Sequence, residues 1–333
     1  MAGSGQCPAV GRREAIPTER QSRDNRHPAA AAQRGQMAVI LNGVSMDIQE
    51  GFRDVAPVRP AAGYIGGKRR LARRIISVIE SIPHGCYAEP FVGMGGVFLR
   101  RRLAPKLEVI NDISGDVATF FRILQRHHNA FVDMLRWQLT GRREFERLKA
   151  CDPATLTDLE RAARFLYLQR TAFGGKVSGR NFGVSPGEGA AFNPLRLVPV
   201  IDDLHERLAG IVIEQLHYAD FIRRYDRPGT LFYLDPPYAG SEDDYGKGVF
   251  TPADFLALAE LLAGLQGRFV LSINDTPAIR QAFSRFALQP VDLTYSVGGG
   301  RRSTAAQELI VTDGKGGAGA LKPPRRENQF DAI

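Results

Sequence analysis

Apolar and polar residues follow two different spacings along this chain, and together these spacings predict a succession of helices and strands. Apolar residues that recur every three or four positions are typical of amphipathic helices, and short apolar runs bounded by turn residues are typical of buried strands. Helices are predicted at 68–81, 96–102, 117–139, 157–171, from 251 and at 277–286. Strands are predicted at 86–90, 107–110, 211–214, 230–234, 269–273, 291–295 and 308–311. This alternation predicts an α/β sheet with helices on both faces.

The alternation is interrupted in the middle of the chain and is absent at its two ends. Residues 174–192 are loop-rich and basic, so we interpret 118–207 as a mainly helical domain inserted into an α/β domain at 61–117 and 208–313. Residues 1–60 are expected to be disordered or irregular and 314–333 to form a disordered tail, because these segments cannot bury a core. Met37 precedes the first apolar stretch and is an alternative to Met1 as the biological start.

Composition narrows the classes of partner. The 44 Lys and Arg residues against 36 Asp and Glu residues give a net charge of +8, which suits a polyanion but also fits an ordinary basic protein. No apolar stretch reaches the length of about 20 residues that spans a bilayer, so we expect no membrane partner and a cytoplasmic location. Cys7, Cys86 and Cys151 lack metal or disulfide spacing, and we expect no metal site.

A glycine-rich turn follows the first predicted strand of the α/β domain, in the run Glu89-Pro90-Phe91-Val92-Gly93-Met94-Gly95-Gly96. Glycines at this place let backbone approach a ligand closely. Asp112 closes the next strand about 20 residues on, where a carboxylate can accept hydrogen bonds from ribose hydroxyls. A dinucleotide such as NAD fits less well, since Phe98 occupies the position of the third glycine. A nucleoside ligand without a diphosphate and an ordinary strand–turn–helix both remain open.

A second glycine turn, Tyr64-Ile65-Gly66-Gly67-Lys68, precedes the first predicted helix. It is not a triphosphate-binding loop, because Ala62 replaces the first glycine and Arg69 replaces Ser or Thr. What remains is a tight turn that offers an aromatic face and an ammonium group. Taken alone, it is better explained as a solvated helix start.

The third motif, Asp235-Pro236-Pro237-Tyr238, comes directly after the apolar run 230–234. The Asp235 carboxylate and the Pro236 carbonyl can each accept one N–H from the amino group of a flat base such as adenine. This pairing favours a tetrahedral nitrogen whose lone pair points at an electrophile, a form of electrostatic preorganisation. Tyr238 can stack on a base rotated out of a duplex. A proline-bounded turn after a strand is the alternative reading.

These motifs, in this order, resemble those of the Dam-like DNA adenine methyltransferases. Secondary matches are 271–276 and 308–310, and the resemblance spans about 62–313. It implies a class I methyltransferase fold, which is a Rossmann-like, mostly parallel sheet whose last strand is antiparallel. It also implies S-adenosyl-L-methionine as methyl donor and site-specific methylation of the exocyclic amino group of an adenine flipped from double-stranded DNA.

The resemblance also assigns residues to roles. The implied donor contacts are Tyr64, Gly66, Gly67, Lys68, Glu89, Pro90, Phe91, Gly93, Gly95, Asp112, Ile113 and Asp235. Asp235, Pro236, Pro237 and Tyr238 would hold the target base, and 118–207 would be the target-recognition domain. Within it, 170–175 and 180–183 resemble the family's DNA-reading loop. The candidate DNA contacts are Arg170, Lys176, Arg180, Asn181, Arg301 and Arg302.

Other readings stay open at this level. The same amine chemistry would serve methylation of cytosine N4 or of RNA, and a relative that binds DNA without catalysis is a third reading. The family resemblance suggests a monomer, and a cognate restriction enzyme is a possible partner. Neither the recognition sequence nor the membership of a restriction-modification system follows from the sequence.

Overall fold

The computed structural model describes residues 51–68, 70–184, 189–242, 248–296 and 303–315. These described residues belong to one compact unit. The expectations for residues 1–50 and 316–333, the alternative start at Met37, and the candidate DNA contacts Arg301 and Arg302 lie outside the described residues.

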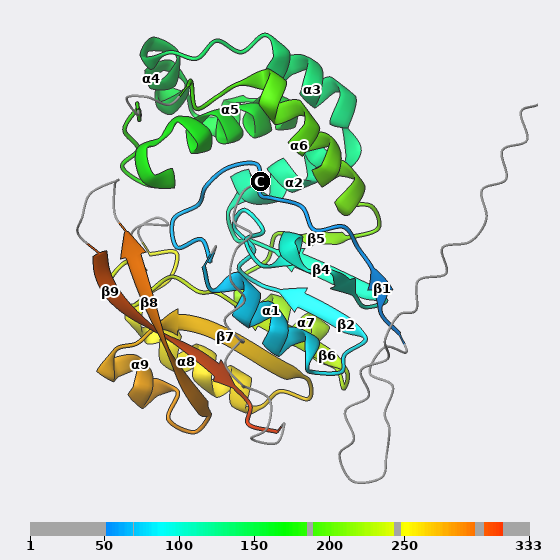
Figure 1. Ribbon diagram of the computed structural model, residues 1–333, viewed down its shortest axis with the longest axis vertical. Helices are drawn as coiled ribbons and strands as arrows, with labels where there is room; N and C mark the ends of the chain where they lie inside the picture. The colour runs from blue at the N-terminus through cyan, green and yellow to red at the C-terminus, as the bar shows by residue number, and fades with distance from the viewer. Residues whose placement is uncertain (1–50, 69, 185–188, 243–247, 297–302, 316–333) are drawn as a thin grey trace, which may run out of the picture. The chain divides into compact units, whose positions relative to one another are not determined.

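The core of the described chain is a seven-stranded sheet with the order β5-β4-β2-β6-β7-β9-β8 (Figure 1). Its strands are β2 (Cys86–Glu89), β4 (Leu107–Asn111), β5 (Val212–Glu214), β6 (Thr230–Leu234), β7 (Arg268–Asn274), β8 (Ala287–Ser296) and β9 (Ser303–Thr312). Strands β5, β4, β2, β6 and β7 pair in parallel, whereas β9 is antiparallel to both β7 and β8. The expected α/β class and the antiparallel last strand are therefore confirmed, as in a class I methyltransferase fold.

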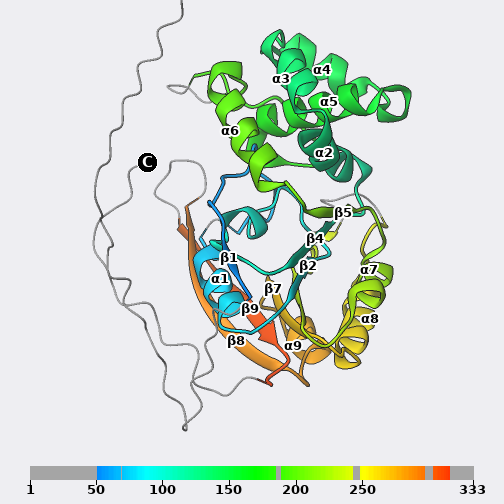
Figure 2. The same ribbon diagram turned by 90° about the vertical axis from the view of Figure 1, so that its right-hand side faces the viewer.

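The central strands are apolar throughout because both faces of the sheet are covered. Successive side chains of a strand point to opposite faces. Accordingly, Leu231 and Tyr233 pack in the core on one face, and Phe232 and Leu234 pack in the core on the other. Helix α1 (Ala72–Glu80) covers the first face, and α7 (Tyr218–Tyr225), α8 (Pro252–Ala263) and α9 (Pro277–Ala282) cover the second (Figure 2).

Five helices follow one another between β4 and β5 and pack together as a layer of their own (Figure 1). They are α2 (Gly115–Arg126), α3 (His128–Arg136), α4 (Arg142–Ala150), α5 (Asp158–Thr171) and α6 (Pro194–Arg207). Helix α5 begins with a capping box between Thr157 and Glu160, in which the side chain of each residue accepts a hydrogen bond from the other's backbone N–H. No helix in the described part of the chain has the length and apolar character needed to cross a membrane.

A buried ion cluster joins this helical layer to the sheet. Glu108 on β4, which is 2% exposed, accepts two hydrogen bonds from Arg207 at the end of α6, at 2.9 and 2.8 Å. Arg101 donates to the same carboxylate at 2.9 Å and is fully buried. Each charge is thus paired inside the protein, which offsets the cost of removing it from water.

Three of the predicted helices are wrong in extent, and the one expected at 277–286 ends at Ala282. The helix expected at 96–102 is a single 3-10 turn, Phe98–Arg100, because Arg101 turns to an extended backbone and sends its side chain to Glu108. The helix expected at 117–139 is interrupted at His127, whose φ of −127° and ψ of 33° are not helical. Helices α4, α6 and α7 and the two-residue strands β1 (Arg53–Asp54) and β3 (Leu103–Ala104) were not predicted.

Candidate active site

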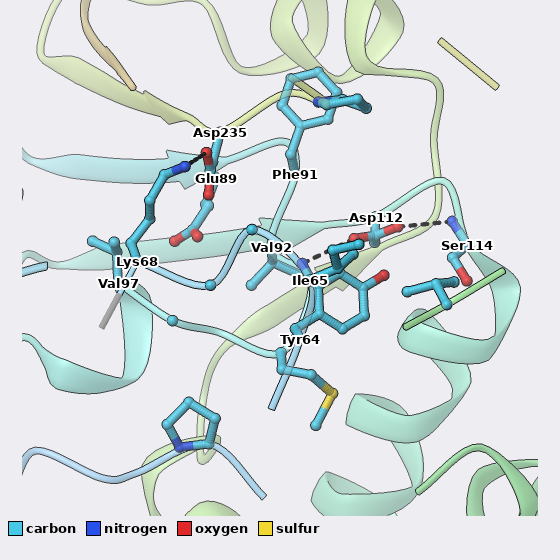
Figure 3. Close-up of a pocket in the computed structure, with 18 of the residues that line it drawn as sticks. Tyr64, Ile65, Lys68, Glu89, Phe91, Val92, Val97, Asp112, Ser114 and Asp235 are labelled. Atoms are coloured by element: carbon cyan, nitrogen blue, oxygen red, sulfur yellow. Dashed lines mark hydrogen bonds and ion pairs between the residues drawn. The ribbon is translucent and has the colours of Figure 1, made fainter. Parts of the chain in front are cut away.

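A cavity of about 590 Å³ opens where β2, β4 and β6 end (Figure 3). The chain leaves β2 for β4 on one side and later returns to β6 on the other, so this edge is a point at which the strand order reverses. Ligands of open α/β sheets bind in such crevices, beyond the carboxyl ends of the strands. This topology explains why three carboxyl groups line one cavity. Each stands at the end of one of the three strands, and they are Glu89, Asp112 and Asp235.

Asp112, at the end of β4, is held by two backbone N–H groups (Figure 3). Its Oδ2 accepts a hydrogen bond from Gly93 N at 2.9 Å, and its Oδ1 accepts one from Ser114 N at 2.9 Å. Burial raises the pKa of Asp112 to about 6, and these two N–H donors oppose the rise. Each oxygen keeps a further lone pair, so the carboxylate can still accept hydrogen bonds from a pair of ligand hydroxyls.

The glycine turn after β2 owes its shape to two positive φ angles. Gly93 has a φ of 50°, and a Cβ there would lie 2.9 Å from the ring of Tyr64, which lines the cavity. Gly95 has a φ of 75°, and its Cβ would lie 2.8 Å from the side chain of Leu99. Gly95 therefore faces the protein interior, and its part in the site is to let the turn form.

One wall of the cavity is aromatic. Phe91 lies against Tyr218 with ring centroids 5.6 Å apart and against Phe250 at 6.0 Å, and Tyr218 and Phe250 lie 5.7 Å apart. All three rings line the cavity. Tyr218 and Phe250 were missed from the sequence, because nothing near them in the chain distinguishes them from ordinary core residues. Such a wall offers a flat, apolar surface to a ring system.

At the other end of the cavity, Asp235 is bound by a buried ammonium group. Lys68 Nζ lies 2.8 Å from Asp235 Oδ1, and the Lys68 side chain is 2% exposed (Figure 3). The same ammonium donates to the hydroxyl of Tyr238 and lies 4.1 Å from the centre of its ring. It is also 3.7 Å from Oε2 of Glu308 on β9, a residue that the sequence placed in a motif without a role.

Strand β7 supplies the support for Asp235 and for the loop that follows it. Ser272 Oγ donates to Asp235 Oδ1 at 3.2 Å. Asn274 accepts a hydrogen bond from Ala239 N and donates one to Ala239 O, both at 3.0 Å, so it fixes the chain directly after the Asp-Pro-Pro-Tyr loop. Burial raises the pKa of Asp235 to about 6, and the Lys68 ammonium opposes this rise.

Glu89 is the most deeply buried carboxyl group of the cavity, at 2% exposed. Its Oε2 accepts a hydrogen bond from Tyr87 Oη at 2.6 Å. Burial raises the pKa of Glu89 to about 8, with the Tyr87 hydroxyl opposing the rise and the charge of Asp235 adding to it. Of the three carboxyl groups of the cavity, Glu89 therefore holds its proton to the highest pH.

Most residues that the sequence assigns to the methyl donor line this one cavity. They are Tyr64, Gly66, Gly67, Lys68, Glu89, Pro90, Phe91, Gly93, Asp112, Ile113 and Asp235. Gly95 is not among the lining residues. Of the motif assigned to the target base, Asp235 and Pro237 line the cavity, whereas Pro236 is buried and Tyr238 stands beside Lys68. The contacts themselves remain predictions.

The basic loop after α5 carries Lys176, Arg180 and Asn181, of which Lys176 and Asn181 are exposed. A hollow of about 430 Å³ lies beside it, lined by Lys149, Arg164, Val177, Gly179, Arg180 and Asn181. The charged groups of this lining are cations. Desolvation lowers the pKa of Arg180, and the charge of nearby Arg164 lowers it further. Lys149 and Arg164 were missed because helix periodicity gives no sign that they face a hollow.

Arg170 differs from the other candidate DNA contacts. Its guanidinium donates to the carbonyl oxygens of Ala61 and of Ala191, and it lines the large cavity. Both interactions are with backbone, so Arg170 holds two segments of the protein together. A contact with DNA by this residue stays a prediction.

Comparison with known proteins agrees with this geometry. The chain is 28% identical over 279 residues to the Type II methyltransferase M1.LlaDCHI of Lactococcus lactis subsp. cremoris, a match that covers 77% of this chain and 95% of that protein. It is 27% identical over 274 residues to the DNA adenine methylase of Escherichia coli K12, covering 74% and 93% respectively. It is 21% identical over 235 residues to the Type II methyltransferase M.CviBI of Paramecium bursaria Chlorella virus NC1A, covering 69% and 88%.

Residues 64–297 match the family described as D12 class N6 adenine-specific DNA methyltransferase. This range contains most of the residues that line the cavity, the loop after α5 and the Asp-Pro-Pro-Tyr motif. The chain therefore belongs to the D12 class of N6 adenine-specific DNA methyltransferases, and it is an enzyme that methylates adenine in DNA.

Proposed function

We propose that the enzyme transfers a methyl group from S-adenosyl-L-methionine to the exocyclic amino group of an adenine rotated out of double-stranded DNA. The observation that carries this proposal is that Asp112 and Asp235 line one continuous cavity. A nucleoside-binding carboxylate and an amine-binding carboxylate thus share a single space.

The cavity fits the methyl donor in size and chemistry. Its volume of about 590 Å³ lies within the range of roughly 300–1,000 Å³ that small ligands occupy. Asp112 would accept hydrogen bonds from the ribose hydroxyls, and the wall of Phe91, Tyr218 and Phe250 would contact the adenine ring. When bound, the donor supplies an electrophilic methyl group on a sulfonium.

On the side of the target base, Asp235 accepts an N–H of the adenine amino group and so directs the nitrogen lone pair toward the electrophile. This role needs the ionised carboxylate, which the Lys68 ammonium favours at 2.8 Å. Since the pKa of Asp235 in the free enzyme is about 6, kcat/KM should fall as the pH drops below that value.

We propose that residues 118–207 form the target-recognition domain, inserted into a catalytic domain at 61–117 and 208–313. DNA contacts are assigned to the face around the hollow, through Lys149, Lys176, Arg180 and Asn181. Phosphate groups would bind there, because the lining supplies cations and hydrogen-bond donors.

The catalytic proposal is tested with Asp235→Ala and labelled methyl donor. The variant should bind donor and DNA but transfer no label, whereas Asp220→Asn, a change in an exposed ion pair on α7, should be fully active. Digestion of the labelled DNA should yield N6-methyladenine. Transfer by Asp235→Ala, or label found in N4-methylcytosine or only in RNA, would contradict the proposal. Sequencing of the methylated bases in cellular DNA would give the recognition site.

The assignment of the DNA face is tested by salt dependence. Lys149→Met should reduce the slope of log K against log salt by about 1, the loss expected for one phosphate contact. Arg223→Met is a matched control, because Lys149 and Arg223 are both exposed cations that pair with an acid three residues earlier on the same helix. An unchanged slope for Lys149→Met would remove that residue from the DNA face.

A further inference from the structure

Gln169, in the last turn of α5, lies between the loop assigned to DNA and the segment that lines the donor cavity. Its side chain is 1% exposed. Nε2 donates to Gly63 O at 2.9 Å and to Gly175 O at 2.6 Å. Oε1 accepts a hydrogen bond from Arg180 Nη2 at 3.1 Å. One buried amide thus uses both of its donors and an acceptor to hold segments that are far apart in the chain.

The two segments that Gln169 joins belong to different ligands. Gly63 and the adjacent Tyr64 line the donor cavity. Gly175 and Arg180 belong to the basic loop, and Arg180 also lines the hollow assigned to DNA. A displacement of either segment would therefore break hydrogen bonds of a buried amide, and an unpaired buried polar group costs about 1–3 kcal/mol.

The backbone contact beside Gln169 leaves little room for one segment to move alone. Gly175 has a φ of 66°, and a Cβ there would lie 3.2 Å from the backbone of Gly63. The loop itself is tied to the end of α5, since Phe173 N donates to Asn181 O and Gly183 N donates to Thr171 O, both at 2.8 Å. The loop and the donor segment thus meet as two backbones in contact, with Gln169 as the side chain between them.

We infer that Gln169 is a positioning residue that couples the donor site to the DNA site. Binding of either ligand orders its own segment, and through Gln169 it orders the segment of the other ligand as well. The second ligand then loses less conformational entropy on binding and binds more tightly. By thermodynamic linkage, DNA raises the affinity for the donor by the same factor as the donor raises the affinity for DNA. This inference rests on the proposed function, because it assigns one ligand to each segment.

The test measures the affinity of S-adenosyl-L-homocysteine by calorimetry, alone and with a saturating duplex that carries a sequence methylated by the wild-type enzyme. The wild type should bind more tightly with DNA by about 5-fold or more, within the usual range of coupling between sites. Gln169→Met should reduce this factor to about 1. A wild type that binds neither ligand would refute the proposed function instead, so the two failures are distinguishable.

Gln125 on α2 provides a matched control. Its Nε2 also bridges two backbone carbonyls, those of Leu208 and Ile211, at 2.9 and 2.8 Å, but both lie outside the two ligand segments. Gln125→Met should keep the wild-type factor. If Gln169→Met keeps it, or if Gln125→Met loses it equally, the assignment to Gln169 is overturned.

A second variant covers the case in which Gln169→Met does not fold. Arg180→Met leaves both donor contacts of Gln169 in place and removes the partner of its Oε1, together with the hydrogen bond from Arg180 Nε to Lys176 O and a proposed DNA contact, whose loss the saturating DNA offsets. At saturating DNA it should give a coupling factor below that of the wild type, and an unchanged factor would contradict the inference.

Discussion

Glu89→Gln isolates the free energy of one buried carboxyl group. Glu89 is 2% exposed and accepts a hydrogen bond from Tyr87 Oη at 2.6 Å. Glutamine has nearly the same shape, and its carbonyl oxygen can accept the same hydrogen bond. The substitution therefore removes the ability to ionise while keeping the packing.

The sign of the effect follows from the direction of the pKa shift. The pKa of Glu89 is raised from 4.5 to about 8 in the folded protein, mainly by burial. Below pH 4.5 the carboxyl group is protonated in both states and costs nothing. As the pH rises from 4.5 to 8 only the unfolded state ionises freely, so the folded state is progressively destabilised. At about 1.4 kcal/mol per pKa unit, the cost reaches about 3–5 kcal/mol above pH 8.

The assay is urea unfolding of both proteins at pH 5 and pH 9. Glu89→Gln should change the free energy of unfolding little at pH 5 and should exceed the wild type by about 3–5 kcal/mol at pH 9. Groups common to both proteins, such as Asp112, affect the two alike and cancel in the comparison. A difference between the two proteins that is equal at both pH values would refute the reasoning that Glu89 is held protonated.

Three further substitutions test other contacts. Gly175→Ala should destabilise the fold by about 1 kcal/mol more than Gly174→Ala in urea unfolding, because both have positive φ but only the first brings a Cβ to 3.2 Å from another segment; equal losses would contradict the close contact. Asn274→Ala removes two hydrogen bonds to the loop after Tyr238 and should lower kcat about 10-fold at unchanged donor affinity. An unaltered kcat would show that contacts other than those of Asn274 position this loop. Arg207→Met should cost about 3–5 kcal/mol of stability, since it leaves Glu108 buried with one fewer partner, and a loss below about 1 kcal/mol would count against the buried pair.

The sequence was informative wherever function depends on neighbours in the chain. Apolar runs ending in a turn or a carboxylate placed Glu89, Asp112 and Asp235 at strand ends, and the parallel sheet brings such ends to one edge. The capping box of Thr251 and Asp254 is local in the same way, because a cap involves residues three apart. The helix expected at 96–102 is wrong because the chain becomes extended at Arg101, whose side chain pairs with Glu108 on β4, and helical periodicity does not show such a partner.

The amino-acid sequence by itself thus determined the α/β class, the motifs that follow its strands and the three carboxyl groups of the cavity. Only the tertiary structure decided which distant groups complete them. Lys68 pairs with Asp235, Phe91 meets Tyr218 and Phe250, and Gln169 joins two loops. Local patterns encode backbone geometry over a few residues, whereas these contacts exist only when folding brings together segments roughly 100 or more positions apart.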